Sequence, residues 1–286
     1  MNKIAIIYNP NAGSAKIKKL LKIKERLSLK SSVTIYDTQK PGDATSIAKR
    51  ECKNFDIIVA AGGDGTINEV INGIDVNTKL GIIPLGTANI LAIEAGIKND
   101  VKSICKLIEK GNTKKIYISN INDKKFFLMA GIGYDGDIVH KMKPSLKKIF
   151  GKAMFGFLGL LEFFKLKKYN IKVETESETA FGNWVLVTNS KHYAGPYKIT
   201  KSTSIFNDSI VCYVFNDLSR LGFLYYIFLI IFYGDLSRSK KVTKIISKNI
   251  KISSKEKINV QCDGEKYGNL PIEINFSSEV VNLLTA

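Results

Sequence analysis

A chain of 286 residues is long enough for one large core or two modest ones, and its 45% hydrophobic and 24% charged residues argue against a disordered protein. Lys and Arg outnumber Asp and Glu by 43 to 26, and the formal net charge of +17 favours anionic partners: phosphorylated ligands, nucleic acid or an acidic membrane surface. A lysine-rich solvated surface would explain the same excess. The four cysteines lie far apart without a CxxC pair, so neither a metal cage nor a disulfide framework is predicted, and a reducing compartment fits.

The first hundred residues repeat one pattern of apolar strand, turn and amphipathic helix. The strands are predicted at 4–8, 33–36, 57–61 and 80–84, and the helices at 15–29, 44–52, 67–74 and 90–95. This alternation predicts an α/β domain with a mainly parallel sheet that is covered on both faces. Ligands of such sheets bind beyond the carboxyl ends of the strands, so the turns that follow the strands are the candidate sites.

Three glycines follow the third predicted strand, in the segment GGDGTINEV. Glycine lets the backbone approach a ligand and reach positive φ, and N–H groups at a helix start attract anions, so Gly62, Gly63 and Gly65 predict a phosphate cradle. No GxxxxGK[ST] occurs, so the segment is not a P-loop. A simple chain turn would explain the glycines about as well.

Two further features of this turn concern its charge and its helix. Thr66 is the predicted helix N-cap, with Glu69 three residues later as in a capping box. Asp64 would repel a phosphate unless a divalent cation lay between them, which points to a magnesium nucleotide. Asp64 could instead cap a loop.

After residue 120 the pattern changes to short alternating strands, predicted at 171–174, 184–188, 210–215, 250–253 and 257–261. Two apolar helical segments interrupt them, at 146–169 and 218–240. The longest apolar run, 221–233, is shorter than the roughly 20 residues needed to cross a bilayer, so no transmembrane segment is predicted. The sequence predicts a second, β-rich domain.

The glycine turn resembles the nucleotide-binding motif of the diacylglycerol kinase catalytic-domain family, which includes bacterial lipid kinases and sphingosine kinases. Other segments agree in order and spacing: YNPNAG at 8–13, PLGTAN at 84–89, AGIGYDGDIV at 130–139, HYAGPYKI at 192–199 and DGE at 263–265. The resemblance implies an N-terminal α/β domain of the NAD kinase and diacylglycerol kinase type and a β-sandwich-like second domain, a two-domain α+β protein overall. The expected boundaries are 1–119, with 270–286 returning, and 120–269.

The resemblance also implies ATP and Mg²⁺ as cofactors. It places the nucleotide against Asn9, Pro10, Thr38, Gly62, Gly63, Asp64, Gly65, Thr66, Asn68, Glu69, Gly86, Thr87 and Asn89. Short hydroxyl and amide side chains at strand ends can bind phosphate, ribose or base, although turn formation and N-capping would explain Asn9 and Thr87 equally well.

The segment GIGYDG matches GxGxxG, but a weak helix start follows it, without a further βαβ unit, so a dinucleotide site is not predicted. The resemblance makes Asp135 a candidate for a metal and water network; a turn aspartate is the equal alternative. NDSIVC stands where many relatives have DDGxLD, which leaves Asp208 as the candidate for a structural magnesium. Ile90 follows Asn89 where many relatives have Asp, so Asp64 and Asp135 remain for the active-site metal.

The resemblance places the general base in the DGE segment. Asp263 is the favoured base, with Glu265 assisting, and the reverse assignment stays open. Without the resemblance, the same residues would indicate an exposed hairpin turn.

These features predict an ATP-dependent lipid kinase that transfers the γ-phosphoryl group of Mg-ATP to a lipid alcohol such as diacylglycerol, in the cleft between two domains. Alternatives are a soluble NAD kinase and a catalytically idle membrane-binding homologue. Nucleic acid is not a predicted partner, because RNP, zinc-finger and recognition-helix patterns are missing. The identity of the lipid and the oligomeric state, including a homodimer, stay open.

The expected location is cytoplasmic, peripherally attached to the inner face of an anionic membrane. The apolar helical segments are predicted either to line the acceptor groove or to pack in the core. Cations flank both segments and would supply the attachment: Lys141, Lys143, Lys147, Lys148, Lys152, Lys165, Lys167, Lys168, Arg220, Arg238, Lys240 and Lys241.

Overall fold

The chain is described by a computed structural model over residues 1–10, 14–142, 152–193 and 195–285. It divides into two compact units, unit 1 with Met1–Ile118 and Ser278–Ala286, and unit 2 with Ser119–Ser277. The boundaries expected from the sequence were 119 and 270.

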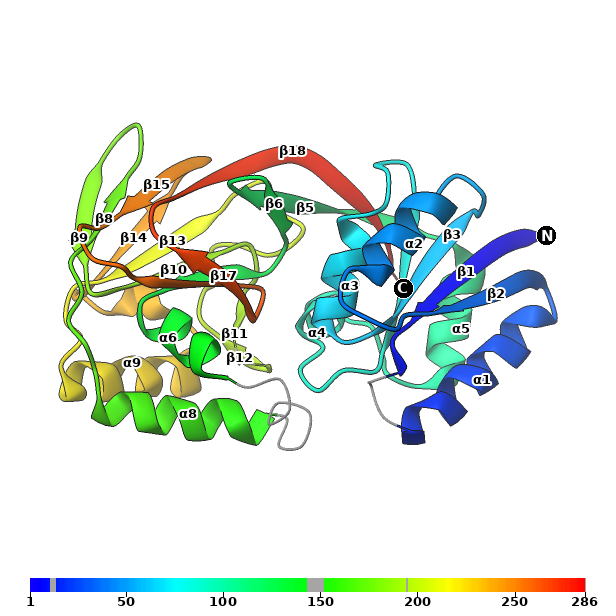
Figure 1. Ribbon diagram of the computed structural model, residues 1–286, viewed down its shortest axis with the longest axis horizontal. Coiled ribbons are helices and arrows are strands. Elements are labelled where there is room, and N and C mark those ends of the chain that lie inside the picture. The colour runs from blue at the N-terminus through cyan, green and yellow to red at the C-terminus, as the bar shows by residue number, and fades with distance from the viewer. Residues whose placement is uncertain (11–13, 143–151, 194, 286) are drawn as a thin grey trace. The chain divides into compact units, whose positions relative to one another are not determined.

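Unit 1 is a parallel sheet covered by helices. Its strands, in spatial order, are β2 (Ser31–Asp37), β1 (Asn2–Tyr8), β3 (Ile57–Gly62), β4 (Lys79–Pro84) and the last part of β18 (Ile272–Leu284). Its helices are α1 (Ser14–Ser28), α2 (Asp43–Glu51), α3 (Asp64–Ile71), α4 (Ile90–Glu94) and α5 (Val101–Lys110). Helices α1 and α5 cover one face, and α2 and α3 cover the other (Figure 1). The predicted α/β architecture is confirmed.

Strands β1, β3 and β4 are buried along most of their length, because helices cover both faces of the sheet. Burial on both faces explains why these strands appear in the sequence as continuous apolar runs rather than as alternating ones. Their carboxyl ends lead into α1, α3 and α4, which brings the turns after these strands to one edge of the sheet.

Unit 2 is a β-sandwich. One sheet of its described residues has the order β14 (Val242–Ile246), β13 (Val211–Phe215), β10 (Trp184–Thr188), β7 (Met129–Ile132), β16 (Asn259–Cys262) and β17 (Glu265–Asn269). The facing strands are β6 (Lys124–Phe126), β8 (Ile171–Glu174), β9 (Thr179–Gly182), β15 (Asn249–Ser253), the first part of β18 and the end of β5 (Thr113–Ile121), which belongs to unit 1 up to Ile118. A small hairpin pairs β11 (His192–Tyr193) with β12 (Tyr197–Lys198). One buried cluster includes side chains from both sheets: Ile132, Val185, Val214, Ile171, Ile252 and Ile274.

The helices of unit 2 lie on the outer face of the β7-containing sheet (Figure 1). They are α6 (Tyr134–Lys141), α8 (Lys152–Phe164), α9 (Arg220–Phe232) and the short 3-10 helix η2 (Leu236–Arg238). Side chains alternate along β10, so Val185 faces the sandwich core while Trp184 faces the helices, 6.1 Å from Phe223 of α9 between ring centres. In the described parts of the chain, every helix is too short or too polar to cross a membrane.

Two details differ from the sequence prediction. The segment at GIGYDG was predicted to be only a weak helix start, and the structure has helix α6 there, beginning at Tyr134. Strand β7 pairs antiparallel with β10 and β16, so the segment still lacks the βαβ context of a dinucleotide site. Strand β18 joins unit 1 later than residue 270, because Ile272–Asn275 still pair with β15, whereas Asn282 and Leu283 pair with β4.

Candidate active site

A small cavity lies beyond the carboxyl ends of β1 and β2, beside α3. Its volume is about 120 Å³, and its lining includes four predicted nucleotide-binding residues, Asn9, Thr38, Thr66 and Glu69. The Asn9 amide Nδ2 donates to the Thr66 hydroxyl at 3.2 Å. Complete ligand pockets measure roughly 300–1,000 Å³, so this cavity could hold only part of a nucleotide.

A larger open cavity of about 560 Å³ lies at the opposite ends of the strands, where Asn2, Ile57 and Lys79 begin β1, β3 and β4. None of the predicted site residues lines it. Ligands of open α/β sheets bind at the carboxyl ends of the strands, so we place the site at the smaller cavity.

The glycine turn after β3 lies directly against the PLGTAN turn after β4. Leu85 and Gly86 donate their backbone N–H groups to the Gly62 carbonyl at 2.9 and 3.1 Å. A Cβ atom on Gly86 would lie 2.4 Å from the Gly63 Cα, so glycine is required where the two backbones meet. The expectation of positive φ in the glycine turn was wrong, because Gly62, Gly63 and Gly65 are not among the described glycines with positive φ.

The predicted capping box was also wrong. Helix α3 begins at Asp64 with Gly63 as an extended N-cap, so Thr66 lies inside the first turn. The Glu69 carboxylate instead accepts hydrogen bonds from the N–H groups of Gly42 and Ala44, both at 3.1 Å, at the start of α2. Glu69 therefore caps a neighbouring helix and fixes the loop that borders the cavity.

Asp64 connects the two strand-end turns. Its carboxylate accepts hydrogen bonds from the backbone N–H groups of Ile90 at 3.1 Å and Leu91 at 3.2 Å, at the start of α4. Burial raises the pKa of the Asp64 carboxyl, and the backbone hydrogen bonds offset part of that rise. In this structure Asp64 holds α4 against the glycine turn.

The remaining predicted nucleotide-binding residues lie around these turns. Thr87 and Pro10 are exposed, and Asn68 is half-buried on α3. Asn89 adopts a left-handed φ of 50° and donates its amide to the Gly86 carbonyl at 3.0 Å. Its buried Oδ1 atom has no hydrogen-bond partner among the described residues, so it is one acceptor that a ligand could satisfy. Residues 11–13 of the YNPNAG motif lie outside the described residues.

Sequence reasoning missed one cation at this edge of the sheet. Lys16, in the first turn of α1, donates from Nζ to the Leu85 carbonyl on the PLGTAN turn. This places a positive charge where a P-loop lysine would otherwise be expected near phosphates. The only sequence signal was a lysine at the start of the first helix, and it did not stand out among its lysine neighbours.

In unit 2, the carboxyl group of Asp135 is buried, and its two oxygens differ in their hydrogen bonding. The Tyr193 hydroxyl donates to its Oδ1 at 2.6 Å, while Oδ2 is buried without a regular hydrogen bond to the described residues. Burial raises the pKa of Asp135 to about 6, and the nearby Tyr193 hydroxyl and Trp184 indole lower it by less. Tyr193 belongs to the HYAGPYKI motif, but its partner could not be predicted from the sequence.

The DGE segment forms the hairpin turn between β16 and β17. Asp263 and Gly264 have φ values of 49° and 78°, the left-handed pair typical of a type I′ turn. The Asp263 carboxylate accepts three backbone hydrogen bonds, from Phe127, Leu128 and Met129 at 3.1, 3.0 and 2.9 Å. Glu265 follows as an exposed residue at the start of β17. Asp263 therefore holds the loop before β7, and Glu265 is the carboxylate that reaches solvent.

Gln261 connects this turn to the surroundings of Asp135, and sequence reasoning missed it. Its side-chain Oε1 accepts the N–H of Gly264 at 2.8 Å. Its Nε2 lies over Gly131, where a Cβ atom would come within 2.7 Å of Nε2 and 2.6 Å of the Asp135 Cβ. Gln261 is buried, which made it indistinguishable from a core strand residue in the sequence.

Of the predicted metal-binding residues, Asp64 fits this geometry better than Asp208. Among the described residues, no three His, Cys, Asp or Glu side chains gather into a metal cage, and Asp208 is exposed. The residues around Asp208 therefore do not fit a structural magnesium. A nucleotide-bound Mg²⁺ keeps several waters and needs only one or two carboxylates, so Asp64 at the helix start fits as a contact made through water.

The comparisons with known proteins agree with this geometry. Residues 3–121 match the family model described as diacylglycerol kinase catalytic domain, and residues 129–285 match that of a YegS C-terminal NAD kinase beta sandwich-like domain. A diacylglycerol kinase of Staphylococcus aureus (strain bovine RF122 / ET3-1) is 32% identical over 279 residues, covering 93% of this chain and 87% of that protein.

Solved structures share the fold at lower identity. A diacylglycerol kinase from Bacillus anthracis str. Sterne superimposes with a TM-score of 0.77 at 21% identity, covering 100% of this chain and 97% of that one. An NAD kinase from Archaeoglobus fulgidus in complex with ATP gives a TM-score of 0.55 at 16% identity, covering 99% and 93%.

An α/β unit with a glycine turn at its strand ends, followed by a β-sandwich unit, is the fold that this chain shares with the solved diacylglycerol kinase and NAD kinase. Among proteins of that fold, the chain belongs to the diacylglycerol kinase catalytic-domain family. It is a lipid kinase, a phosphotransferase.

Proposed function

We propose that the protein transfers the γ-phosphoryl group of Mg-ATP to the hydroxyl of diacylglycerol or a closely similar lipid alcohol. The observation that carries this proposal is the contact between the two glycine-containing turns, with Gly63 against Gly86 and Asp64 bound to the start of α4. The backbone N–H groups at the start of a helix can bind phosphate oxygens, and glycine leaves this backbone accessible to them. Asn9, Thr38 and Thr66 supply the hydroxyl and amide groups beside them.

Mg²⁺ would enter with ATP and neutralise the charge that develops on the transferring phosphoryl group. Asp64 would hold it through water, and Lys16 would add a fixed positive charge at the PLGTAN turn. Calorimetry with and without Mg²⁺ tests this role: Asp64→Asn should weaken Mg²⁺-dependent ATP binding, and unchanged affinity would contradict it.

Glu265 is the proposed proton acceptor, the alternative that the sequence had left open. The Asp263 carboxylate already accepts three backbone hydrogen bonds and holds the loop before β7, whereas Glu265 is exposed. In the proposed step, the oxygen of the lipid hydroxyl attacks the γ-phosphorus, and Glu265 takes the proton of that hydroxyl. The bond between that phosphorus and the β–γ bridging oxygen breaks, and ADP leaves.

One assay tests both the activity and the base. ATP consumption is measured with diacylglycerol in mixed micelles, with NAD and with neither, and only the lipid should sustain turnover. NAD-dependent turnover would favour the soluble NAD kinase. Glu265→Gln should lower kcat about 10²- to 10⁴-fold with the fold intact, the usual effect of losing a general base. Asp263→Asn should mainly lower thermal stability, and the opposite result would return the base to Asp263.

We also propose that the protein binds peripherally to the inner face of an anionic membrane. Lys165, Lys167 and Lys168 are exposed beside α8, whereas Lys143, Lys147 and Lys148 lie outside the described residues. Each cation near an anionic leaflet contributes about 1 kcal/mol. Sedimentation with anionic vesicles should therefore exceed that with neutral ones and weaken as salt rises; equal binding to both would contradict the proposal.

A further inference from the structure

Helix α9 is apolar on both of its faces. Its inner face is buried through Phe223, Tyr226, Leu229 and Ile230. Its outer face, which we call the α9 face, consists of Leu221, Leu224, Tyr225, Phe228, Ile231 and Phe232, with Leu221 81% and Phe232 69% exposed. A surface helix of a globular protein normally presents polar side chains to water on this side. The α9 face therefore requires a partner.

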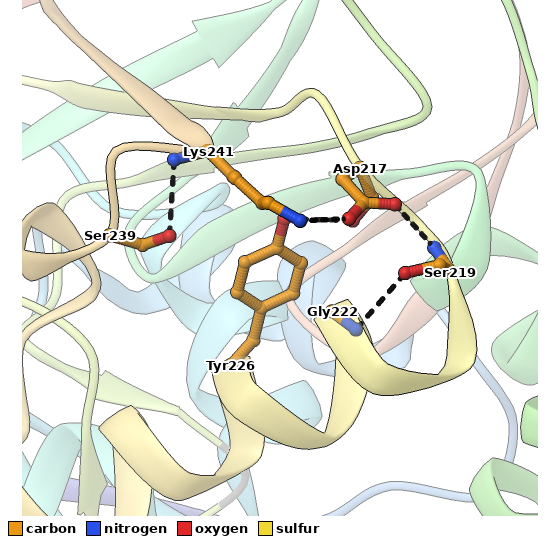
Figure 2. A network of polar contacts seen from close by, with 6 residues as sticks. All are labelled: Asp217, Ser219, Gly222, Tyr226, Ser239 and Lys241. Carbon is orange, nitrogen blue, oxygen red and sulfur yellow. Dashed lines mark hydrogen bonds and ion pairs between the residues drawn. The ribbon is translucent and has the colours of Figure 1, made fainter.

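The inner contacts fix the direction in which the α9 face points. Ser219 caps the helix by accepting the Gly222 N–H at 3.1 Å, and the Tyr226 hydroxyl donates to the Asp217 carbonyl at 2.7 Å (Figure 2). The Asp217 carboxylate pairs with Lys241 at 2.6 Å, and this contact contributes most to lowering the pKa of Asp217 to about 2. These contacts hold the helix in one rotation, so its outer side chains stay directed away from the sandwich.

Helix α8 extends the apolar surface. The rings of Phe163 and Phe223 lie 5.6 Å apart, and the Arg220 guanidinium donates to the Phe164 carbonyl at 3.3 Å, so the two helices are in contact. Leu160 and Phe164 of α8 are more than half exposed. The exposed apolar side chains thus continue from one helix to the next.

The charges around this surface are mostly positive, although Asp217, paired with Lys241, lies before α9 and Asp235 lies after it. Arg238 lies 4.4 Å from the Tyr233 ring at the end of α9, Arg220 stands at its start, and Lys240 and Lys165 are exposed nearby in the chain. The α9 face itself carries no acidic residue. Glu162 of α8 is buried and paired with Lys141 at 2.6 Å. A second copy docked by two-fold symmetry would bring these cations together, whereas an anionic lipid surface would attract them.

We propose that the α9 face inserts its apolar side chains into the interfacial layer of an anionic membrane leaflet, with the helix lying along the surface. Interfacial helices bind in this way by burying apolar and aromatic side chains while nearby cations contact anionic headgroups. This inference rests on the proposed function, because it names the surface through which a lipid kinase meets its bilayer. It differs from attachment by charge alone, since an inserted share of the binding persists when salt screens the cations.

Substitutions that leave the net charge unchanged distinguish membrane binding by insertion from binding by charge alone. Phe228→Gln/Phe232→Gln removes apolar area without changing the net charge, and the control Phe181→Gln/Ile246→Gln does the same at two side chains that are each 57% exposed on other elements. Sedimentation uses vesicles of equal parts phosphatidylglycerol and phosphatidylcholine, without ATP, at about 1 M salt, where the screening length is about 3 Å. The α9 variant should partition about tenfold less than wild type, and the control should not change. Equal partitioning of the two variants would overturn the proposal.

A second measurement reports insertion directly. In Phe228→Trp, brominated phospholipid should quench the new indole, whereas wild type and Phe181→Trp should show only the baseline of the buried Trp184. Absence of quenching would overturn insertion. If instead wild type is a dimer in lipid-free buffer and Phe228→Gln/Phe232→Gln is a monomer, the α9 face binds a second copy and the proposal is wrong.

A kinase assay on short-chain diacylglycerol dispersed in water separates this inference from the proposed function. An inactive wild type would refute the proposed activity, while the vesicle measurements, which need neither ATP nor substrate, would still decide the role of the α9 face. Loss of turnover in the α9 variant with normal vesicle binding would assign the face to the acceptor groove and overturn docking.

Discussion

At the scale of single residues, three buried or partly buried carboxylates hold distant segments of the chain in place. Asp64, Glu69 and Asp263 each accept two or three backbone N–H groups from a segment distant in the chain. Such charge-assisted hydrogen bonds are about twice as strong as neutral ones, so each side chain holds a loop or a helix start in place. Substitutions at these positions therefore change folding as well as chemistry, and stability must be measured beside activity.

Lys16 offers a test with less of this ambiguity, because its side chain donates to a single backbone carbonyl, that of Leu85, rather than accepting several N–H groups. Lys16→Gln should weaken ATP binding about tenfold, since one cation near phosphate is lost and a charged hydrogen bond contributes about 1.5–3 kcal/mol. Lys18→Gln, an exposed position on the same helix, is the control. Calorimetry checks the result, and equal losses in both variants would show that only net charge matters.

Asp135 predicts a pH dependence of stability. Its pKa in the fold, about 6, exceeds its ordinary value of 3.8, so folding favours the protonated form. The resulting stability is fully present below pH 3.8 and is lost as pH rises through about 6, and it amounts to about 3 kcal/mol. Urea denaturation of Asp135→Asn should lack this loss between pH 4 and pH 7.5. Parallel curves for both proteins would contradict the assignment.

Residue roles could be predicted from the sequence only where they depend on near neighbours. The glycines of the GGDGT turn were predicted to be important. Glycine is required there because Gly63 contacts Gly86 on another turn, and no local sequence pattern shows that contact. Thr66 was taken for an N-cap because the apolar stripe starts at Ile67, whereas the helix starts earlier, at a glycine cap without a side chain. The partner of Asp64 lies 26 residues further along the chain.

At the scale of elements, the contact between the glycine and PLGTAN turns predicts an unusually sensitive glycine. In Gly86→Ala, the added methyl group would meet the Gly63 Cα at 2.4 Å, and the backbone cannot yield as a flexible side chain can. The cost should be about 1–3 kcal/mol in free energy of unfolding, as for other overpacked sites. Thr87→Ala, at an exposed position in the same turn, should leave unfolding unchanged. Urea denaturation distinguishes the two, and a neutral Gly86→Ala would contradict the close contact.

Most elements with a clear period were predicted, but α5 was not, although Ile104, Leu107 and Ile108 recur at helical spacing. The parallel strands of unit 1 and the helices between them follow the apolar pattern to within two or three residues. Helix α6 gave only a weak signal because it contains Gly136, which is needed where the helix crosses Asn259: a Cβ there would lie 2.0 Å from the Asn259 carbonyl oxygen. Helix α9 was found, but an apolar sequence on both faces cannot reveal which face is exposed.

At the scale of the whole molecule, two strands cross the division between the units, β5 at Ile118 and β18 at Ser277. Strand β18 pairs with β15 of unit 2 at Ile272 and with β4 of unit 1 at Leu283. Three polar residues, Ser277, Ser278 and Glu279, interrupt its apolar pattern between the two partners, whereas the return to unit 1 was predicted from the sequence at residue 270. The final residues close the parallel sheet of unit 1, next to the strand that carries the PLGTAN turn.

This arrangement predicts that damage to the end of β18 affects unit 1 alone. Leu283 is fully buried opposite Leu80 of β4, so Leu283→Ala should cost about 2–5 kcal/mol. Thr285→Ala is the control, because the hydrogen bond from Thr285 to the Asn112 carbonyl uses the backbone N–H and is kept. Hydrogen exchange should quicken in β3 and β4 and ATP binding should weaken, while β10 and β13, which have their own sandwich core, keep their protection. Equal acceleration in both units would mean that the two cores unfold together and that β18 couples them.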